Sequence, residues 1–219
     1  MSSLIVLKTS RAARARRKIG EYWHFLCEFL YRPATIGALA PSSTSLATAM
    51  LRPIDFTRAG AIAELGAGTG SFTKHILRRK GDHVRFVALE TNPRLFAFLA
   101  ERWEPACFAQ RSAEELRDTL NERGIQRAGA IVSGLPWASL GRVLQKSILQ
   151  QVSACLAPEG VFVTFAYPQG LLLPGGIRFR RLLDQQFASV ERTKVVWKNL
   201  PPAFVYVCRR QASAAREAA

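Results

Sequence analysis

The sequence predicts an α/β fold with a doubly wound, mostly parallel sheet of seven strands, an antiparallel strand pair at its C-terminal end and an amphipathic helical extension at its N-terminus. From residue 58 onward, short apolar runs alternate with longer runs of helical periodicity, which is typical of parallel sheets with right-handed crossovers. The last two strand-like runs are separated only by Asn199-Leu-Pro-Pro202. So short a connection leaves room only for an antiparallel pair.

Each expected element follows from its local pattern of apolar and turn-forming residues. The expected strands span residues 61–65, 84–90, 107–110, 128–133, 161–167, 187–198 and 203–210. The expected helices between them cover residues 71–79, 93–103 and 140–156. Residues 55–210 are therefore predicted to form the α/β domain, residues 1–54 a covering N-terminal extension, and residues 211–219 a disordered tail.

The charge balance is the unusual bulk property. Lys and Arg number 31 against 16 Asp and Glu, which gives a formal net charge of +15. RNA, DNA and an anionic bilayer surface are all suitable partners, and charge alone does not separate them. The four cysteines form no CxxC pair, so we expect no disulfide framework, no metal site and a cytoplasmic location. No apolar run approaches the roughly 20 residues of a membrane-spanning helix.

The N-terminal extension carries its own signal. Residues 11–18 contain five basic side chains, and residues 19–30 repeat apolar residues at helical spacing until Arg32-Pro33 ends the pattern. Two interpretations stand: the helix covers the core, or it lies on a bilayer with basic residues at lipid phosphates. Further along, Ser42-Ser43 is expected either in a loop over the ligand site or at a helix N-cap.

A glycine-rich turn, Glu64-Leu-Gly-Ala-Gly-Thr-Gly70, follows the first expected strand. Its glycines allow the backbone to approach a ligand, but the third glycine that a dinucleotide site needs is missing. Glu64 is unfavourable beside a phosphate and favourable beside an ammonium group. Glu90 ends the second strand, where an acidic side chain can accept hydrogen bonds from both hydroxyls of a ribose.

The residues ELGAGTG followed by ALE resemble motif I and its acidic successor in class I S-adenosylmethionine-dependent methyltransferases, over about residues 55–210. The resemblance implies a Rossmann-like fold and S-adenosylmethionine as cofactor. It implies that the glycine turn holds the amino-acid end, Glu90 the ribose, and Ala113 or Glu114 the adenine, although many members carry Asp where this chain has Ser112. The residues expected at the cofactor are Glu64, Gly66, Ala67, Gly68, Gly70, Glu90, Thr91, Ala113, Glu114 and Ser133.

The fourth expected strand ends in Ser133-Gly-Leu-Pro-Trp137, where class I enzymes that act on amines bind the acceptor. The segment is similar to the Asn-Leu-Pro-Tyr sequence that the rRNA adenine N6-dimethyltransferases carry at this position, but Gly134 stands in place of their Asn. SGLP, together with residues 32–50, instead resembles bacterial phospholipid N-methyltransferases, which convert phosphatidylethanolamine stepwise to phosphatidylcholine. The alternatives are an rRNA adenine N6-methyltransferase and a non-catalytic membrane- or RNA-binding protein that retains the cofactor fold.

The substrate class that this resemblance implies sets the expected chemistry. An aliphatic ammonium has a pKa of about 10.4 and must lose a proton before it accepts a methyl group, and Tyr167 and Tyr22 are the candidate bases. Either tyrosine, or Trp137, can also hold the headgroup cation on its ring face. The leucines at 171–173 are expected either at acyl chains or packed under their loop. The residues expected at the substrate are Gly134, Leu135, Pro136, Trp137, Arg178 and Arg180, with an arginine on the lipid phosphate.

These expectations place the protein at the inner face of the cytoplasmic membrane. The basic amphipathic helix would bind the anionic surface peripherally, and the substrate would be a phospholipid in that surface. RNA remains a less favoured partner, and no obligate protein partner is evident.

Overall fold

The computed structural model describes residues 43–210, and within them the chain forms one seven-stranded sheet. The strand order is β3-β2-β1-β4-β5-β7-β6. The five strands from β3 to β5 in this order run parallel to one another, whereas β7 runs antiparallel to both β5 and β6. This arrangement confirms the predicted fold class. The expected N-terminal helix, with Tyr22, and the C-terminal tail lie outside the described residues.

The strands and helices alternate along the chain, and two of the helices, over residues 116–122 and 174–186, were not among the expected ones. The strands are β1 (Ala61–Leu65), β2 (Arg85–Leu89), β3 (Phe108–Ala109), β4 (Ala128–Ser133), β5 (Leu156–Ala166), β6 (Ser189–Arg192) and β7 (Phe204–Arg209). The helices are α2 (Thr44–Leu51), α3 (Thr73–Arg79), α4 (Pro93–Arg102), α5 (Leu116–Glu122), α6 (Arg142–Cys155) and α7 (Pro174–Gln186). Short 3₁₀ turns lie at η1 (Pro105–Cys107), η2 (Ala113–Glu115), η3 (Trp137–Ser139) and η4 (Pro168–Leu172).

Strands β5 and β6 each have one boundary that differs from the expected one by more than two residues. Strand β5 begins five residues early, at Leu156, and its pairing with β4 shifts register between Ala128 and Ala130. Strand β6 ends at Arg192 rather than continuing to residue 198, and beyond it only Val196 forms a bridge, with Ala203. The chain turns directly after this bridge, so the β-branched residues before it cannot extend the ladder.

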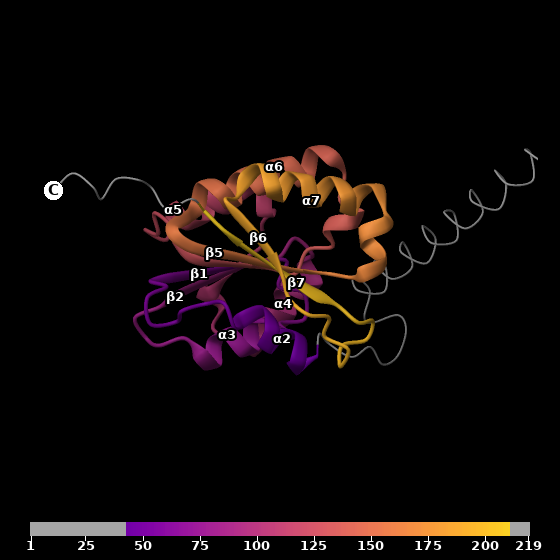
Figure 1. Ribbon diagram of the computed structural model, residues 1–219. Coiled ribbons are helices and arrows are strands. Elements are labelled where there is room, and N and C mark those ends of the chain that lie inside the picture. Colours follow the sequence, from indigo (N-terminus) through magenta and orange to yellow (C-terminus); the bar gives the residue numbers. More distant parts are fainter. Residues whose placement is uncertain (1–42, 211–219) are drawn as a thin grey trace, which may run out of the picture. The chain divides into compact units, whose positions relative to one another are not determined.

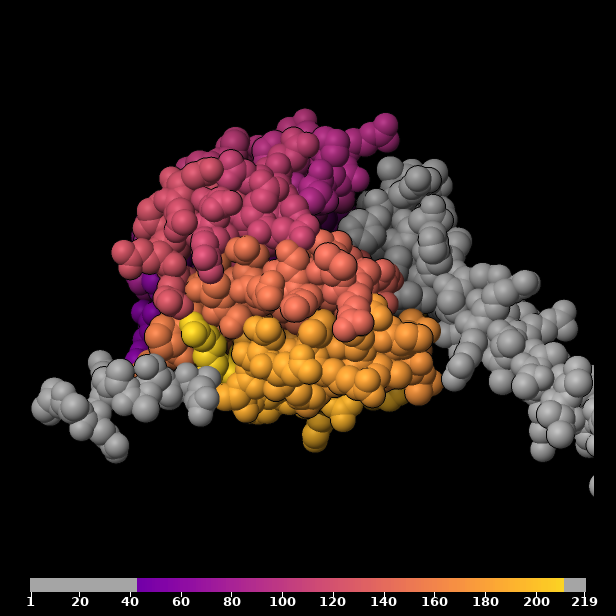
Figure 2. Space-filling model, turned by 90° about the horizontal axis from the view of Figure 1, so that it is seen from above, coloured from indigo at the N-terminus to yellow at the C-terminus, as the bar shows by residue number. Residues whose placement is uncertain are grey.

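The helices form two layers, one on each face of the sheet (Figure 1). Helices α2, α3 and α4 cover one face, and α5, α6 and α7 cover the other. Seen from outside, α6 lies between α5 and α7 (Figure 2). Helix α2 packs against α3, β5 and β7, so the α/β unit includes residues 44–51.

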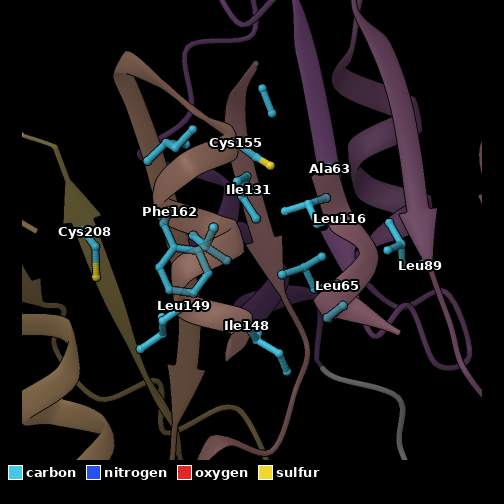
Figure 3. Packing of buried hydrophobic residues seen from close by; sticks show 14 of the residues in the cluster. Ala63, Leu65, Leu89, Leu116, Ile131, Ile148, Leu149, Cys155, Phe162 and Cys208 are labelled. Carbon is cyan, nitrogen blue, oxygen red and sulfur yellow. The ribbon is translucent and has the colours of Figure 1, made fainter. Parts of the chain in front are cut away.

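The core lies between the sheet and these helices, and its strands are apolar on both faces because both are covered. All five residues of β1 are buried. Figure 3 shows Ala63 and Leu65 of β1 beside Ile131 of β4, with Phe162 of β5 near Leu149 of α6. This packing fixes the carboxyl ends of the parallel strands, where the predicted site residues lie.

Candidate active site

The carboxyl ends of β1, β2 and β4 meet at the centre of the sheet. Leu65 at the end of β1 pairs with Leu89 on one side and with Ser133 on the other. The glycine turn after β1 folds toward β2, because the N–H groups of Gly66 and Ala67 both donate to the Leu89 carbonyl (2.9 and 3.3 Å). Crossovers leave in opposite directions from this point of the sheet, and ligands of open α/β sheets bind at such a switch point.

The three glycines of the turn all adopt positive φ, at +70° for Gly66, +58° for Gly68 and +80° for Gly70. They differ in what surrounds them. A Cβ on Gly66 would lie 2.7 Å from the Leu135 side chain, and one on Gly70 would overlap the Trp103 ring. A Cβ on Gly68 would meet no protein atom within 4 Å. Two glycines therefore serve packing against the protein, whereas Gly68 leaves an open side that a ligand can approach.

Glu64 is fully buried on β1 behind the turn. The Thr73 hydroxyl, in the first turn of α3, donates to its Oε2 (2.6 Å). Its Oε1 has no hydrogen-bond partner in the described part of the chain. Burial raises the pKa of Glu64 from 4.5 to about 8, against the lowering effect of the Thr73 hydrogen bonds, and the nearby Glu90 raises it further. A buried acceptor without a partner fits a ligand that brings a cationic donor, such as an ammonium group.

Glu90 follows β2 and is also buried, but its carboxylate is already oriented. Its Oε2 accepts from the Gly68 N–H (2.8 Å) and its Oε1 from the Asn92 N–H (2.9 Å). Each carboxylate oxygen has further acceptor capacity, so the group can still accept two hydroxyl protons from a ribose. The Glu90–Gly68 hydrogen bond also links the predicted ribose contact to the open glycine. Thr91, which comes next, is exposed.

The segment after β3 is built as a helix N-terminus. The Ser112 hydroxyl accepts from the Glu114 N–H (3.2 Å), and the Glu115 carboxylate accepts from the Ser112 N–H (3.0 Å), which forms a capping box. Ser112, at the position where many family members carry Asp, thus caps η2. Ala113 is buried and Glu114 is half-buried beside it, so both predicted adenine contacts lie at the start of this turn.

The segment Ser133–Trp137 is held in place by Ser133 and Gly134. The buried Ser133 hydroxyl accepts from the Leu135 N–H (3.3 Å) and from the Trp137 indole N–H (3.1 Å). The Gly134 N–H donates to the Leu65 carbonyl (2.8 Å). A Cβ on Gly134 would lie 2.6 Å from the Gly66 carbonyl oxygen, so this backbone leaves no space for a side chain there. Leu135 and Pro136 follow, both half-buried.

The aromatic candidates lie beneath and beside this segment. Trp137 is buried, stacks on Phe179 of α7 (4.4 Å between centroids) and meets Phe162 edge-on. Tyr167, just after β5, is also buried and meets Phe165 edge-on (5.5 Å). The structure thus places Trp137 in an aromatic layer of the core, and the roles of Trp137 and Tyr167 at a substrate stay predictions.

The two arginines predicted at the substrate lie on α7 and bind protein groups. Arg178 donates to the Gln145 side chain (2.9 Å) and to the Leu140 carbonyl, beside the Ser133–Trp137 segment. Arg180 pairs with Asp184 (2.8 Å) and lies over the Tyr206 ring, against β7. The structure therefore brings Arg178, but not Arg180, next to the segment Ser133–Trp137, which we call the acceptor segment because it is predicted to bind the methyl acceptor.

Two residues with structural roles at the site were not singled out in the sequence. Thr73 holds Glu64, as described above. Gln145 is fully buried in α6, and its amide donates to the carbonyls of Trp137 and of Gly175 (3.1 Å to the latter), which joins η3 to the start of α7. The signal for Gln145 was an amide on the apolar face of a predicted helix.

Solved structures share this fold. TrmN from Thermus thermophilus superposes with a TM-score of 0.59 at 20% identity, over 83% of this chain and 52% of that one, so this chain spans about half its length. NodS, an N-methyltransferase from Bradyrhizobium japonicum WM9, gives 0.56 at 15% identity, over 77% of this chain and 93% of that one. Human methyltransferase-like protein 13, solved in complex with SAH, gives 0.54 at 16% identity, over 78% and 80%.

Fold and site together define a class I S-adenosylmethionine-dependent methyltransferase, with S-adenosylmethionine as its cofactor. No protein-family model matches the chain. The chain is 32% identical over 197 residues to ornithine lipid N-methyltransferase from Singulisphaera acidiphila. The aligned region covers 86% of this chain and 96% of that enzyme. It belongs to the family of lipid N-methyltransferases that this enzyme represents.

The described residues fit the cofactor. Glu64 would offer its unpartnered carboxylate oxygen to the ammonium of the cofactor, Glu90 would offer acceptors to its ribose, and Gly68 leaves the close approach open. When bound, S-adenosylmethionine supplies a methyl group on a sulfonium, which a nucleophile must approach in line. Within residues 43–210, no helix is long and apolar enough to cross a membrane.

Proposed function

We propose that this chain methylates the primary amine of phosphatidylethanolamine, stepwise toward phosphatidylcholine, at a membrane surface. The similarity to a lipid N-methyltransferase over 96% of that enzyme's length carries the proposal. The described site supports it, because the acceptor segment offers a glycine backbone and no side-chain amide at Gly134. An aliphatic amine needs no planar partner, so the absence of that amide does not impair its binding.

The same geometry argues against the adenine alternative. An exocyclic adenine amine is planar, and the rRNA enzymes that this segment resembles orient it with an Asn side chain. At Gly134 a Cβ would contact the Gly66 carbonyl oxygen at 2.6 Å. The backbone would have to move before any such side chain could be placed there.

A second lipid substrate also has a specific observation in its favour. The Singulisphaera relative is named for ornithine lipid, whose headgroup carries an amine but no phosphate. A phosphate-bearing headgroup would favour a nearby cation, and Arg178 lies beside the acceptor segment although its guanidinium is engaged by Gln145 and Leu140. Exchange of one of these partners for a lipid phosphate would favour phosphatidylethanolamine.

The residues of this chain would contribute positioning and proton removal. Gln145 holds the Trp137 carbonyl and fixes the acceptor segment over β4. The ammonium of the headgroup must lose a proton before it becomes nucleophilic. We assign this role to Tyr167, at the carboxyl end of β5, or to Tyr22 in the N-terminal extension. We also propose that residues 11–30 bind the anionic inner face of the cytoplasmic membrane.

The deciding experiment compares two lipids under one condition. The purified full chain is incubated with labelled S-adenosylmethionine and vesicles that contain either phosphatidylethanolamine or ornithine lipid, and the lipids are analysed by mass spectrometry. Successive additions of one, two and three methyl groups to phosphatidylethanolamine support the proposal. If only ornithine lipid is methylated, ornithine lipid takes the place of phosphatidylethanolamine as the substrate. If adenine in added rRNA is methylated and the lipids are unchanged, the lipid assignment is overturned.

A further inference from the structure

Large apolar side chains that are exposed in the described part of the chain gather at one edge of the sheet. The six such residues are Phe98, Val143, Leu172, Ile177, Trp197 and Leu200. All except Phe98 lie at the carboxyl edge of the parallel strands, which also carries the glycine turn. Leu172, Trp197 and Leu200 lie in connecting segments there, and Val143 and Ile177 lie in the first turns of α6 and α7. Single exposed apolar residues need no explanation, but a group of five at the edge of a ligand site does.

The three connections concerned leave neighbouring strands. Residues 134–143 follow β4, residues 167–178 follow β5, and residues 193–203 lead into β7. Ala166, the last residue of β5, pairs with Phe204, the first of β7, so the connection 167–178 starts beside the end of the connection 193–203. Both lie at the right-hand end of the sheet in Figure 1, in orange and yellow.

Every charged residue in these connections is basic. They contain Arg142, Arg178, Lys194 and Lys198, and none of the chain's 16 acidic residues. Arg142, Lys194 and Lys198 are exposed. Apolar side chains among basic ones, without acidic neighbours, are complementary to a bilayer surface that offers acyl chains under anionic headgroups.

The connection 193–203 holds its two apolar residues outward on a fixed frame. Trp197 is 78% exposed and Leu200 is 83% exposed. Between them the buried Asn199 accepts from the Ser43 N–H (3.0 Å) and donates to the Pro201 carbonyl (2.7 Å). Tryptophan is enriched where protein meets the membrane interface, because its ring is apolar and its N–H is polar.

We infer that the connection 193–203 inserts Trp197 and Leu200 into an anionic lipid bilayer and so docks the carboxyl edge of the sheet on the membrane. This inference rests on the proposed function for its biological sense, since a lipid headgroup could then enter the site without leaving the bilayer. It is independent of the N-terminal extension and of which headgroup is methylated.

The test uses vesicles without any amine headgroup, made of phosphatidylcholine and phosphatidylglycerol, so that binding does not require a substrate. The full chain is compared with the double variant Trp197→Ser/Leu200→Ser and with the control Phe98→Ser, which changes an exposed apolar residue away from this edge. Binding is measured by cosedimentation at high salt, where the electrostatic part is screened. We expect the partition coefficient of the double variant to fall about tenfold or more, and that of the control to stay within about twofold.

A second measurement reports insertion directly. Vesicles with brominated acyl chains should quench the tryptophan emission of the parent more than that of Trp197→Phe. S-adenosylhomocysteine affinity equal to the parent's shows that the variants are folded. Equal vesicle binding by parent and double variant overturns the inference, as does a parent dimer that the double variant converts to a monomer. If the unmodified chain methylates no lipid, the proposed function is overturned, but the vesicle-binding result still stands.

Discussion

Glu64 should make cofactor binding depend on pH, in a direction set by the burial of its carboxyl. Its carboxyl is fully buried, with one oxygen held by Thr73 and the other without a partner. Burial raises its pKa to about 8, so at pH 7 only about one-tenth of the ligand-free protein carries the carboxylate, and at pH 6 about one-hundredth. The ammonium of the cofactor needs the charged form, so binding releases a proton.

The size of the effect follows from these fractions. Apparent affinity scales with the population of the competent form, so the Kd for S-adenosylhomocysteine should fall about tenfold from pH 6 to pH 7 and about fiftyfold from pH 6 to pH 8. Glu64→Gln should bind weakly with no such slope. Thr73→Val removes a hydrogen bond that lowers the pKa, so it should shift the midpoint to higher pH.

Stability of the ligand-free protein should show the opposite trend. Between pH 4.5 and about 8 the unfolded chain loses the Glu64 proton while the folded chain keeps it, so the free energy of unfolding falls as pH rises, by up to about 5 kcal/mol. Glu64→Gln should remove this fall. Isothermal titration in two buffers of different ionisation enthalpy measures the released proton, and urea unfolding measures stability. A pH-independent Kd without proton release in the parent would refute the reasoning.

Three further predictions follow from contacts in and around the site. Gly134→Asn should weaken S-adenosylhomocysteine binding about tenfold or more and lower stability by about 1–3 kcal/mol, because its Cβ would press on the Gly66 carbonyl; a stable variant that methylates adenine would contradict this. Gln145→Leu removes the buried hydrogen bonds of this amide to the Trp137 and Gly175 carbonyls and to Arg178, so urea unfolding should show a loss of about 2–4 kcal/mol. By contrast, Gln150→Leu, exposed on the same helix, should change stability by less than about 0.5 kcal/mol. Replacing four basic residues of the N-terminal extension (Arg14, Arg16, Arg17 and Lys18) by glutamate should reduce cosedimentation with anionic vesicles at low salt and leave S-adenosylhomocysteine affinity unchanged; equal vesicle binding would leave the extension without a membrane role.

The sheet could be predicted because its strands are short, apolar on both faces and bounded by turn residues. Strands β1 and β4 begin and end at the predicted residues, since both are buried runs between polar or glycine-rich connections. Strand β6 was predicted too long, because Val195 and Val196 have strand propensity that the chain does not use. The turn at Trp197–Leu200, fixed by a contact between Asn199 and the distant Ser43, decides the outcome. Such a contact leaves no local pattern.

The site was predictable only to the level of a motif. The glycine turn and Glu90 carry a recognisable spacing, and the structure brings them together at the ends of β1 and β2. The sequence cannot separate glycines that pack against Leu135 and Trp103 from the one that faces open space. It also left Trp137 open between a binding and a core role, and burial against Phe179 depends on how α7 crosses the sheet.

Contacts between Gly66 and the acceptor segment couple the two halves of the site. The Gly66 carbonyl oxygen would touch any Cβ at Gly134, and Leu135 would touch any Cβ at Gly66. Backbone hydrogen bonds reinforce this, because Gly134 donates to Leu65 while Gly66 donates to Leu89. A substitution that reshapes the acceptor side therefore moves the backbone that approaches the cofactor. For this reason a new acceptor preference in this fold should require compensating changes at both glycines, and a single exchange at Gly134 should lose affinity for the cofactor before it gains a new substrate.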